Sequence, residues 1–262
     1  MEDLSLYLNF ARETAFQAGL STLKYYQQNL QPEIISDGSP VTLADRGSEE
    51  LIRRAIEKRF PNHAILGEEF GDSGAGASGK SDHRWIIDPI DGTQSFLHGV
   101  PLYGVLIGLE IEGTVEVGVA YFPALKEMIS AAKGLGCWWN DRPARVSDKA
   151  RLEESVVSFT DIGNFARYGG EESFQRLASK AWYRAGWGDA YGYLLAATGR
   201  VEVMIDPIMA VWDCGPFPPI FREAGGYFGD WQGNETIYAG KSLATSRVLL
   251  SQVLNCLAEK GS

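Results

Sequence analysis

The segment 85–93, WIIDPIDGT, joins a short apolar run to two carboxylates, a glycine and a hydroxyl. Residues 85–87 predict a buried strand, which places Asp88 at its carboxyl end. Asp91 follows three positions later, and the proline between the two acids restricts the backbone there. Because Asp, Pro and Gly are also ordinary turn residues, the segment alone fits either a turn or a pair of ligands for hard cations.

More carboxylates occur at two other places in the chain. A second short strand, expected at 64–66, runs directly into Glu68 and Glu69, and Asp213 follows Trp212 far downstream. If the two strands are neighbours, their terminal acids converge and would repel one another strongly unless cations were bound. Magnesium and similar hard ions prefer such all-oxygen sites, so this arrangement favours a metal site over a turn.

Two of the acids have structural alternatives that the sequence leaves open. Residues 42–45, TLAD, match a capping box, and that role alone could explain Asp45. Asp213 lies at the start of a helix expected over 212–224, and the helix dipole favours a carboxylate at this end. A helix N-terminus beside a metal-bound carboxylate would also suit a phosphate group.

Gly92 and Thr93 follow the acids and could form a cradle for an anion. Glycine allows close backbone approach, and exposed amides with a hydroxyl can bind phosphate oxygens. Metals and anion donors together indicate phosphoryl chemistry. The chain has no G-x-x-x-x-G-K-[ST] loop and no G-x-S-x-G elbow, and its three histidines, which we expect to be structural or exposed, show no ligand spacing.

The composition excludes several classes of protein. The 262 residues are 45% hydrophobic and carry a formal net charge of −10, which disfavours nucleic-acid and anionic-membrane binding. Three cysteines without a C-x-x-C pair predict reduced thiols rather than a disulfide framework or a zinc site. Without an apolar leader or an apolar run of about 18 residues, we expect a cytoplasmic protein that crosses no membrane.

The order of expected elements differs between the two halves. Residues 1–145 predict an α+β unit that carries most of the metal ligands, and residues 146–262 predict an α/β unit that carries Asp213, with a cleft between them. The first half is expected to have helices at 3–28 and 42–60, a turn at 37–40, an exposed loop at 71–82 and antiparallel strands at 103–111, 114–122 and 127–132. The second half is expected to have strands at 155–159, 182–185, 201–205, 227–230 and 236–239, and helices at 171–180, 189–198 and 212–224.

Taken together, these motifs resemble the inositol monophosphatase family over nearly the whole chain. The matching stretches, in the family's order and spacing, are Gly67-Glu68-Glu69, the segment 85–93, and Trp212-Asp213 with 223–226. The resemblance implies a layered αβαβα sandwich of the inositol monophosphatase and fructose bisphosphatase type. It also implies Mg²⁺-dependent hydrolysis of a small phosphate monoester by a homodimer.

The resemblance further assigns roles to individual residues. It implies about two or three Mg²⁺ ions at one site. By motif position, the first metal is held by Glu68, Asp88 and the carbonyl of Ile90, the second by Asp88, Asp91 and Asp213, and a third, weaker one lies within reach of Glu68. Thr93 and Glu68 orient the attacking water, and Asp91, Gly92 and Thr93 place the phosphate. Asp45 is a further acid close to the metals. Glu69 supports the metal ligands without itself binding a metal.

Two stretches of the second half, 187–193 and 201–207, are similar to the histidinol-phosphatase branch of the family. Inositol-specific members carry a small neutral residue at the position of Asp189 and a glutamate at that of Asp206. Two aspartates facing the leaving group would favour histidinol, which carries an ammonium and an imidazole, through charge-assisted hydrogen bonds. The alternative is that Asp189 only caps its helix.

Three functions therefore compete at this point. The first is hydrolysis of L-histidinol phosphate, and the second is the same chemistry on inositol phosphates or a range of sugar phosphates. The third is a regulatory protein of the same fold that binds RNA or the transcription machinery. The charge of −10 opposes direct RNA binding, and the full set of expected ligands favours an active enzyme.

Overall fold

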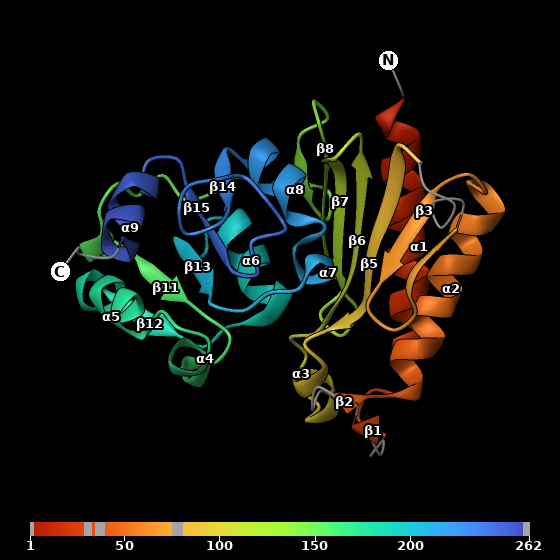
Figure 1. Cartoon of the computed structure of the whole chain (residues 1–262), viewed down its shortest axis with the longest axis horizontal. Coiled ribbons are helices and arrows are strands. Elements are labelled where there is room, and N and C mark those ends of the chain that lie inside the picture. Colours follow the sequence, from red (N-terminus) through yellow and green to blue (C-terminus); the bar gives the residue numbers. More distant parts are fainter. Residues whose placement is uncertain (1–2, 29–32, 35–39, 75–80, 259–262) are drawn as a thin grey trace.

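In the described part of the chain, the larger of the two main β-sheets is largely antiparallel, as the sequence predicts (Figure 1). Among the described residues, one neighbouring pair of its strands is parallel. The computed structural model describes residues 3–28, 33–34, 40–74 and 81–258. In spatial order the eight strands are β10 (Arg142–Pro143), β9 (Cys137–Trp139), β8 (Glu127–Ala132), β7 (Thr114–Phe122), β6 (Gly104–Ile111), β5 (His83–Asp91), β3 (Ala64–Gly67) and β4 (Gly71–Gly74). A separate two-stranded ribbon pairs β1 (Glu33–Ile34) with β2 (Pro40–Val41).

The smaller sheet has five strands and mixes parallel with antiparallel pairing. Its first three strands are parallel, and its last two run against their neighbours. The prediction of a strand at 236–239 was wrong. Ser242–Ser246 lies in the sheet instead, and its small residues are all buried between two neighbouring strands. The spatial order is β12 (Tyr183–Ala185), β11 (Val156–Ser158), β13 (Val203–Asp206), β15 (Ser242–Ser246) and β14 (Gly226–Gly229).

Helices form three layers around these two sheets, which confirms the αβαβα sandwich (Figure 1). One pair covers the outer face of the larger sheet, a second group lies between the sheets, and a third covers the outer face of the smaller sheet. The first pair is α1 (Leu4–Thr22) and α2 (Leu43–Arg59), the middle group is α6 (Asp189–Ala197), α7 (Val211–Cys214) and α8 (Phe217–Ala224), and the third is α4 (Ile162–Arg167), α5 (Glu171–Lys180) and α9 (Leu250–Leu257). The short α3 (Thr93–Leu97) follows β5, and a 3-10 turn spans Leu152–Glu154.

Strand β5 is apolar on both faces because helices cover both. Trp85 and Ile87 pack in the core beneath α1 and α2, whereas Ile86 packs in the core between the two sheets. This two-sided burial explains the continuous apolar run in the sequence. The polar end of the strand, Asp88 to Asp91, lies at one edge of the middle layer of helices.

Several expected boundaries differ from those in the structure. The first helix ends at Thr22 rather than near residue 28, and α9 was not anticipated. The expected loop at 71–82 is wrong at its start, because residues 71–74 pair with β3 as the edge strand β4. Residues 37–39 of the expected turn and residues 75–80 of the loop lie outside the described residues. The helix expected over 212–224 breaks at Gly215–Pro216 into α7 and α8.

The remaining expectations concern cysteines and the membrane. The three cysteines, at positions 137, 214 and 256, are free and buried. In the part of the chain that the structure describes, no helix has the length and apolarity needed to span a bilayer.

Candidate metal and phosphate site

Two parallel strand ends supply the first carboxylates of the site. Strands β3 and β5 are paired with Gly67 opposite Ile87, so both chains leave the sheet at the same edge. The backbone N–H of Glu68 donates to the carbonyl of Ile87 across 3.3 Å, which keeps Glu68 beside Asp88. The predicted convergence of the two strand ends is therefore confirmed.

Asp88, Asp91 and Asp213 form a compact cluster. One carboxylate oxygen from each lies within 4.8 Å of the others. A register shift in β5 separates the two aspartates, and the Ile90 N–H donates to Asp88 Oδ1 at 3.0 Å. Asp213 comes from the other half of the chain, and its Oδ2 accepts the Ala210 N–H at the start of α7 across 2.7 Å. Asp213 thus caps its own helix and belongs to the cluster at once.

The electrostatics of this cluster indicate that it needs a cation. Burial, followed by the charges of Asp213 and Glu69, raises the pKa of Glu68 to about 8. Burial and the neighbouring acids also hold the pKa values of Asp88 and Asp91 well above their usual range. Within the described residues, no lysine, arginine or histidine forms an ion pair with these acids. An all-carboxylate set of this kind fits a hard divalent cation.

Gly92 and Thr93 turn the chain away from the cluster into α3. Gly92 adopts a left-handed conformation with φ of 81°, which glycine reaches at little cost. The Thr93 hydroxyl donates to the Ile90 carbonyl across 3.2 Å. Opposite them, the Ala190 N–H in the first turn of α6 donates to Asp91 Oδ1 at 2.6 Å, so the positive end of that helix faces the site.

Asp45 and Glu69 lie at the rim of the same acidic region. Asp45 completes the predicted capping box, with its Oδ2 accepting the Thr42 N–H at 2.8 Å. Burial raises the pKa of Asp45, and its charge contributes to the raised pKa values of both Glu68 and Glu69. For Glu69, burial is the main cause and brings the pKa to about 7. Asp45 therefore both caps α2 and lies close to the other acids.

A buried ion pair behind the site has no counterpart among the sequence predictions. Arg53 Nε lies 2.7 Å from Glu49 Oε1 on α2, and the two side chains are 9% and 0% exposed. Glu49 also accepts the backbone N–H groups of Glu69 and Phe70 at 2.7 and 3.2 Å, which fixes the turn after Glu68. A Cβ at Gly67 would lie 2.2 Å from Glu49 Oε1, so glycine is required there. In the sequence, this pair is indistinguishable from a solvated i,i+4 surface pair.

Asp189 begins α6 but does not cap it. Its φ is 52°, and in the described part of the chain its carboxylate makes no capping hydrogen bond. Instead, Oδ2 accepts the Ser95 hydroxyl at 3.4 Å and lies 3.0 Å from where a Cβ on Gly92 would stand. Burial raises the Asp189 pKa to about 6. The carboxylate therefore borders the expected phosphate cradle, and the capping alternative is wrong.

Asp206 lies deeper, and its carboxylate accepts three hydrogen bonds from neighbouring residues. It is 3% exposed, and its Oδ1 accepts the Thr160 N–H at 2.9 Å. Its Oδ2 accepts the hydroxyls of Thr160 and Tyr193 at 3.1 and 2.9 Å. Burial raises its pKa to about 7. Direct contact between Asp206 and substrate stays a prediction, whereas these contacts support a positioning role.

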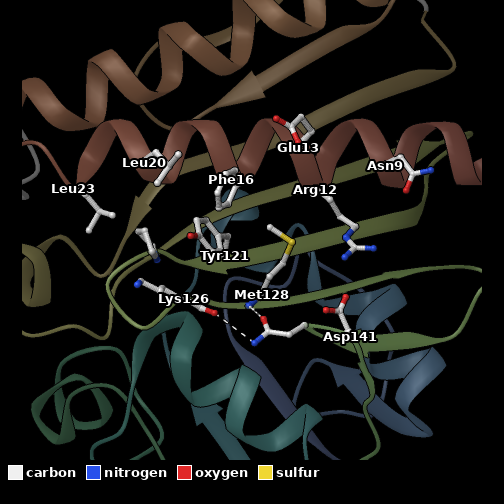
Figure 2. Close-up of a pocket in the computed structure, with 12 residues that line it drawn as sticks. Asn9, Arg12, Glu13, Phe16, Leu20, Leu23, Tyr121, Lys126, Met128 and Asp141 are labelled. Atoms are coloured by element: carbon white, nitrogen blue, oxygen red, sulfur yellow. Dashed lines mark hydrogen bonds between the residues drawn. The ribbon is translucent and has the colours of Figure 1, made fainter.

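A cavity lies elsewhere, between α1 and the strands β7 and β8 (Figure 2). Its volume is about 780 Å³, and Arg12, Phe16, Tyr121 and Met128 are among its lining residues. None of the clustered carboxylates lines it. This cavity is therefore separate from the carboxylate cluster, which lies near the carboxyl ends of β3 and β5.

Comparison with known proteins agrees with this geometry. Residues 3–260 match the inositol monophosphatase family. The chain belongs to this family. It is therefore a phosphoric monoester hydrolase of a metal-dependent family, and its described residues include a cluster of three aspartates that could hold a metal ion.

Individual members of the inositol monophosphatase family differ in their names. A histidinol-phosphatase of Chlorobaculum parvum is 44% identical over 240 residues, with 91% of each chain covered. An inositol-1-monophosphatase of Mesorhizobium japonicum is 32% identical, with 95% of each chain covered. The crystal structure of the extragenic suppressor protein SuhB from Bartonella henselae superposes with a TM-score of 0.89 at 29% identity, covering 98% of this chain and 100% of that one.

The clustered acids lead to a prediction about pH and stability. Because folding raises their pKa values, the folded protein binds more protons than the unfolded chain from about pH 4 to about pH 8. Stability from this cluster is thus complete below that window and is lost as the pH rises through it. We expect the rise in Tm caused by adding a divalent cation to chelator-treated protein to be larger at about pH 8 than at about pH 6. An equal rise at both pH values would contradict the assignment.

Proposed function

We propose that this protein hydrolyses L-histidinol phosphate with Mg²⁺ and water, as an enzyme of histidine biosynthesis. The proposal combines three supports: the acidic cluster, the family membership, and the 44% identity to a histidinol-phosphatase. A cytoplasmic homodimer is part of the same proposal and follows from the family resemblance.

The residues present fit two neighbouring cations. We assign one to Glu68, Asp88 and the Ile90 carbonyl, and a second to Asp88, Asp91 and Asp213. When bound, Mg²⁺ neutralises the phosphate, lowers the pKa of water and stabilises the leaving oxygen. The clustered acids have no cationic side chain as a partner among the described residues, and their raised pKa values supply the physical need for such ions.

The chain's own groups would orient the reactants. Thr93 and Glu68 hold the attacking water, and Asp91, Gly92 and Thr93 place the phosphate. The left-handed turn at Gly92 leaves room for a phosphate oxygen close to the backbone. The N-terminal end of α6, directed at Asp91, favours negative charge at the same place.

Asp189 carries the choice of substrate. Its carboxylate borders Gly92 and Ser95, is not used to cap α6, and has no basic partner among the described residues. A carboxylate beside the phosphate cradle would attract the ammonium or imidazolium of histidinol phosphate through a charge-assisted hydrogen bond. A neutral polyol gains less from the same group.

The test compares phosphate release from L-histidinol phosphate and inositol 1-phosphate with Mg²⁺. We expect wild type to prefer the cationic ester, and Asp189→Asn to lower that preference by about tenfold, the worth of one charge-assisted hydrogen bond. The exposed Asp148→Asn is the matched control and should leave the preference unchanged. A wild-type preference for the inositol ester would favour the alternative substrate class, which the Mesorhizobium relative represents.

A regulatory role is the alternative of another class, and the structural likeness to SuhB is what favours it. The net charge of −10 opposes binding to RNA. Absence of phosphate release from either ester with Mg²⁺ would count for this alternative and against the enzymatic proposal.

A further inference from the structure

The backbone of Asp189 is held in an unusual conformation by a residue from another segment of the chain. Asp189 has φ of 52°, a left-handed value that aspartate tolerates better than most residues but that still has to be stabilised. Its N–H donates to the hydroxyl of Thr160 at 2.8 Å. Thr160 lies two residues after β11, so this bond ties the start of α6 to the carboxyl end of that strand.

The contact between these two segments is very close. A Cβ on Gly188 would lie 2.2 Å from the Cα of Thr160 and 2.7 Å from its hydroxyl oxygen. Gly188 therefore brings the backbone before Asp189 directly against Thr160. Together with the hydrogen bond, this packing limits how far the Asp189 backbone can turn.

Thr160 is itself held in place by hydrogen bonds to Asp206. The two carboxylate oxygens of Asp206 accept the Thr160 N–H at 2.9 Å and its hydroxyl at 3.1 Å. The Asp206 carboxylate also accepts the Tyr193 hydroxyl at 2.9 Å, and Tyr193 belongs to α6. Asp206 thus holds both Thr160 and the helix that Asp189 begins, which leaves the Thr160 hydroxyl oriented to accept from Asp189.

We propose that Thr160, oriented by Asp206, is a positioning residue for substrate selection, because it holds Asp189 in the conformation that directs its carboxylate toward Gly92 and Ser95. The inference rests on the proposed function, in which Asp189 reads the cationic part of the substrate. It assigns Asp206 a part in specificity without contact to the substrate.

The test is Thr160→Val, which keeps the shape of the side chain and removes the hydroxyl. We expect KM for L-histidinol phosphate to rise by about tenfold, the effect of one lost hydrogen bond, with kcat and the kinetics on inositol 1-phosphate nearly unchanged. Thr160→Ser keeps the hydroxyl and should restore the preference. In an Asp189→Asn background, Thr160→Val should lower the substrate preference little further, because Thr160 acts through the Asp189 carboxylate.

Each outcome separates the two proposals. If wild type shows no preference for the cationic ester, the proposed function fails and this inference fails with it. If wild type shows the preference and folded Thr160→Val retains it, only the inference is overturned. An equal loss on both esters with a lower Tm would also overturn it, since that result indicates a purely structural role. Should Thr160→Val not fold, Asp206→Asn, which cannot accept all three bonds, must lower the preference for the inference to stand.

Discussion

Replacing Asp91 with asparagine is expected to lower kcat by about a thousandfold, which corresponds to about 4 kcal/mol of lost transition-state stabilisation. Asparagine keeps an oxygen that can accept the Ala190 N–H, the 2.6 Å bond that joins this position to α6. It removes the charge that the cluster with Asp88 and Asp213 offers to a cation. Steady-state phosphate release and calorimetric Mg²⁺ titration together measure the effect.

A matched measurement separates lost function from lost folding. Because burial and neighbouring charges, first that of Asp189, raise the pKa of Asp91, removing its charge relieves repulsion. The chelator-treated Asp91→Asn variant should therefore melt at or above the wild-type temperature, and its Tm should gain less from Mg²⁺. The exposed Asp148→Asn should behave as wild type in both measurements. Wild-type turnover and Mg²⁺ affinity in Asp91→Asn would rule out the metal assignment.

The meeting of Glu68 with Asp88 and Asp91 could be predicted because each strand end carries its own local signal, whereas Asp213 was joined to them only by the family resemblance. Each of two apolar strands ends directly in acids, and parallel neighbours end at the same edge of a sheet. The capping box at Asp45 is equally local, and it occurs as predicted. Sequence reasoning is reliable where the signal lies within a few residues and the partner has the same kind of signal.

The supports behind the cluster could not be predicted in the same way. Glu49 and Arg53 look like an ordinary surface pair, and only the packing of the turn at 68–71 over α2 shows that they are buried. Asp206 lies in the stretch 201–207 that the sequence singles out, but tens of residues separate it from Thr160, and no sequence signal pairs the two. Tertiary packing decides these roles, and one sequence contains no record of which segments meet.

The break between α7 and α8 is another feature that packing explains. Gly108 and Gly118 lie opposite each other on β6 and β7. A Cβ on Gly108 would lie 2.5 Å from the Gly215 carbonyl oxygen, and one on Gly118 would lie 1.9 Å from that of Pro216. Because neither glycine has a side chain, the backbone between α7 and α8 packs directly against the larger sheet at these two positions. Because Asp213 lies two residues before Gly215, this contact sets how near it comes to the other acids.

Gly118→Ala tests that dependence directly. The added methyl cannot be accommodated 1.9 Å from a backbone oxygen, so the start of α8 must move away from the sheet. We expect the free energy of unfolding to fall by about 3 kcal/mol, the cost of overpacking a well-filled core. A displacement of Asp213 by about 1 Å would lower kcat by about a hundredfold, although the substituted residue touches none of the acids.

Gly47→Ala is the control for the Gly118→Ala experiment. Gly47 lies on the exposed side of α2, where a Cβ would meet nothing within 4 Å. Alanine there should raise the free energy of unfolding by up to about 1 kcal/mol through helix propensity, with kcat unchanged. Thermal melts and phosphate release on both variants give the comparison. A Gly118→Ala protein with wild-type Tm and kcat would mean that Asp213 reaches the cluster independently of this contact. A loss of kcat with Mg²⁺ affinity retained would place the displacement at the phosphate cradle instead of at Asp213.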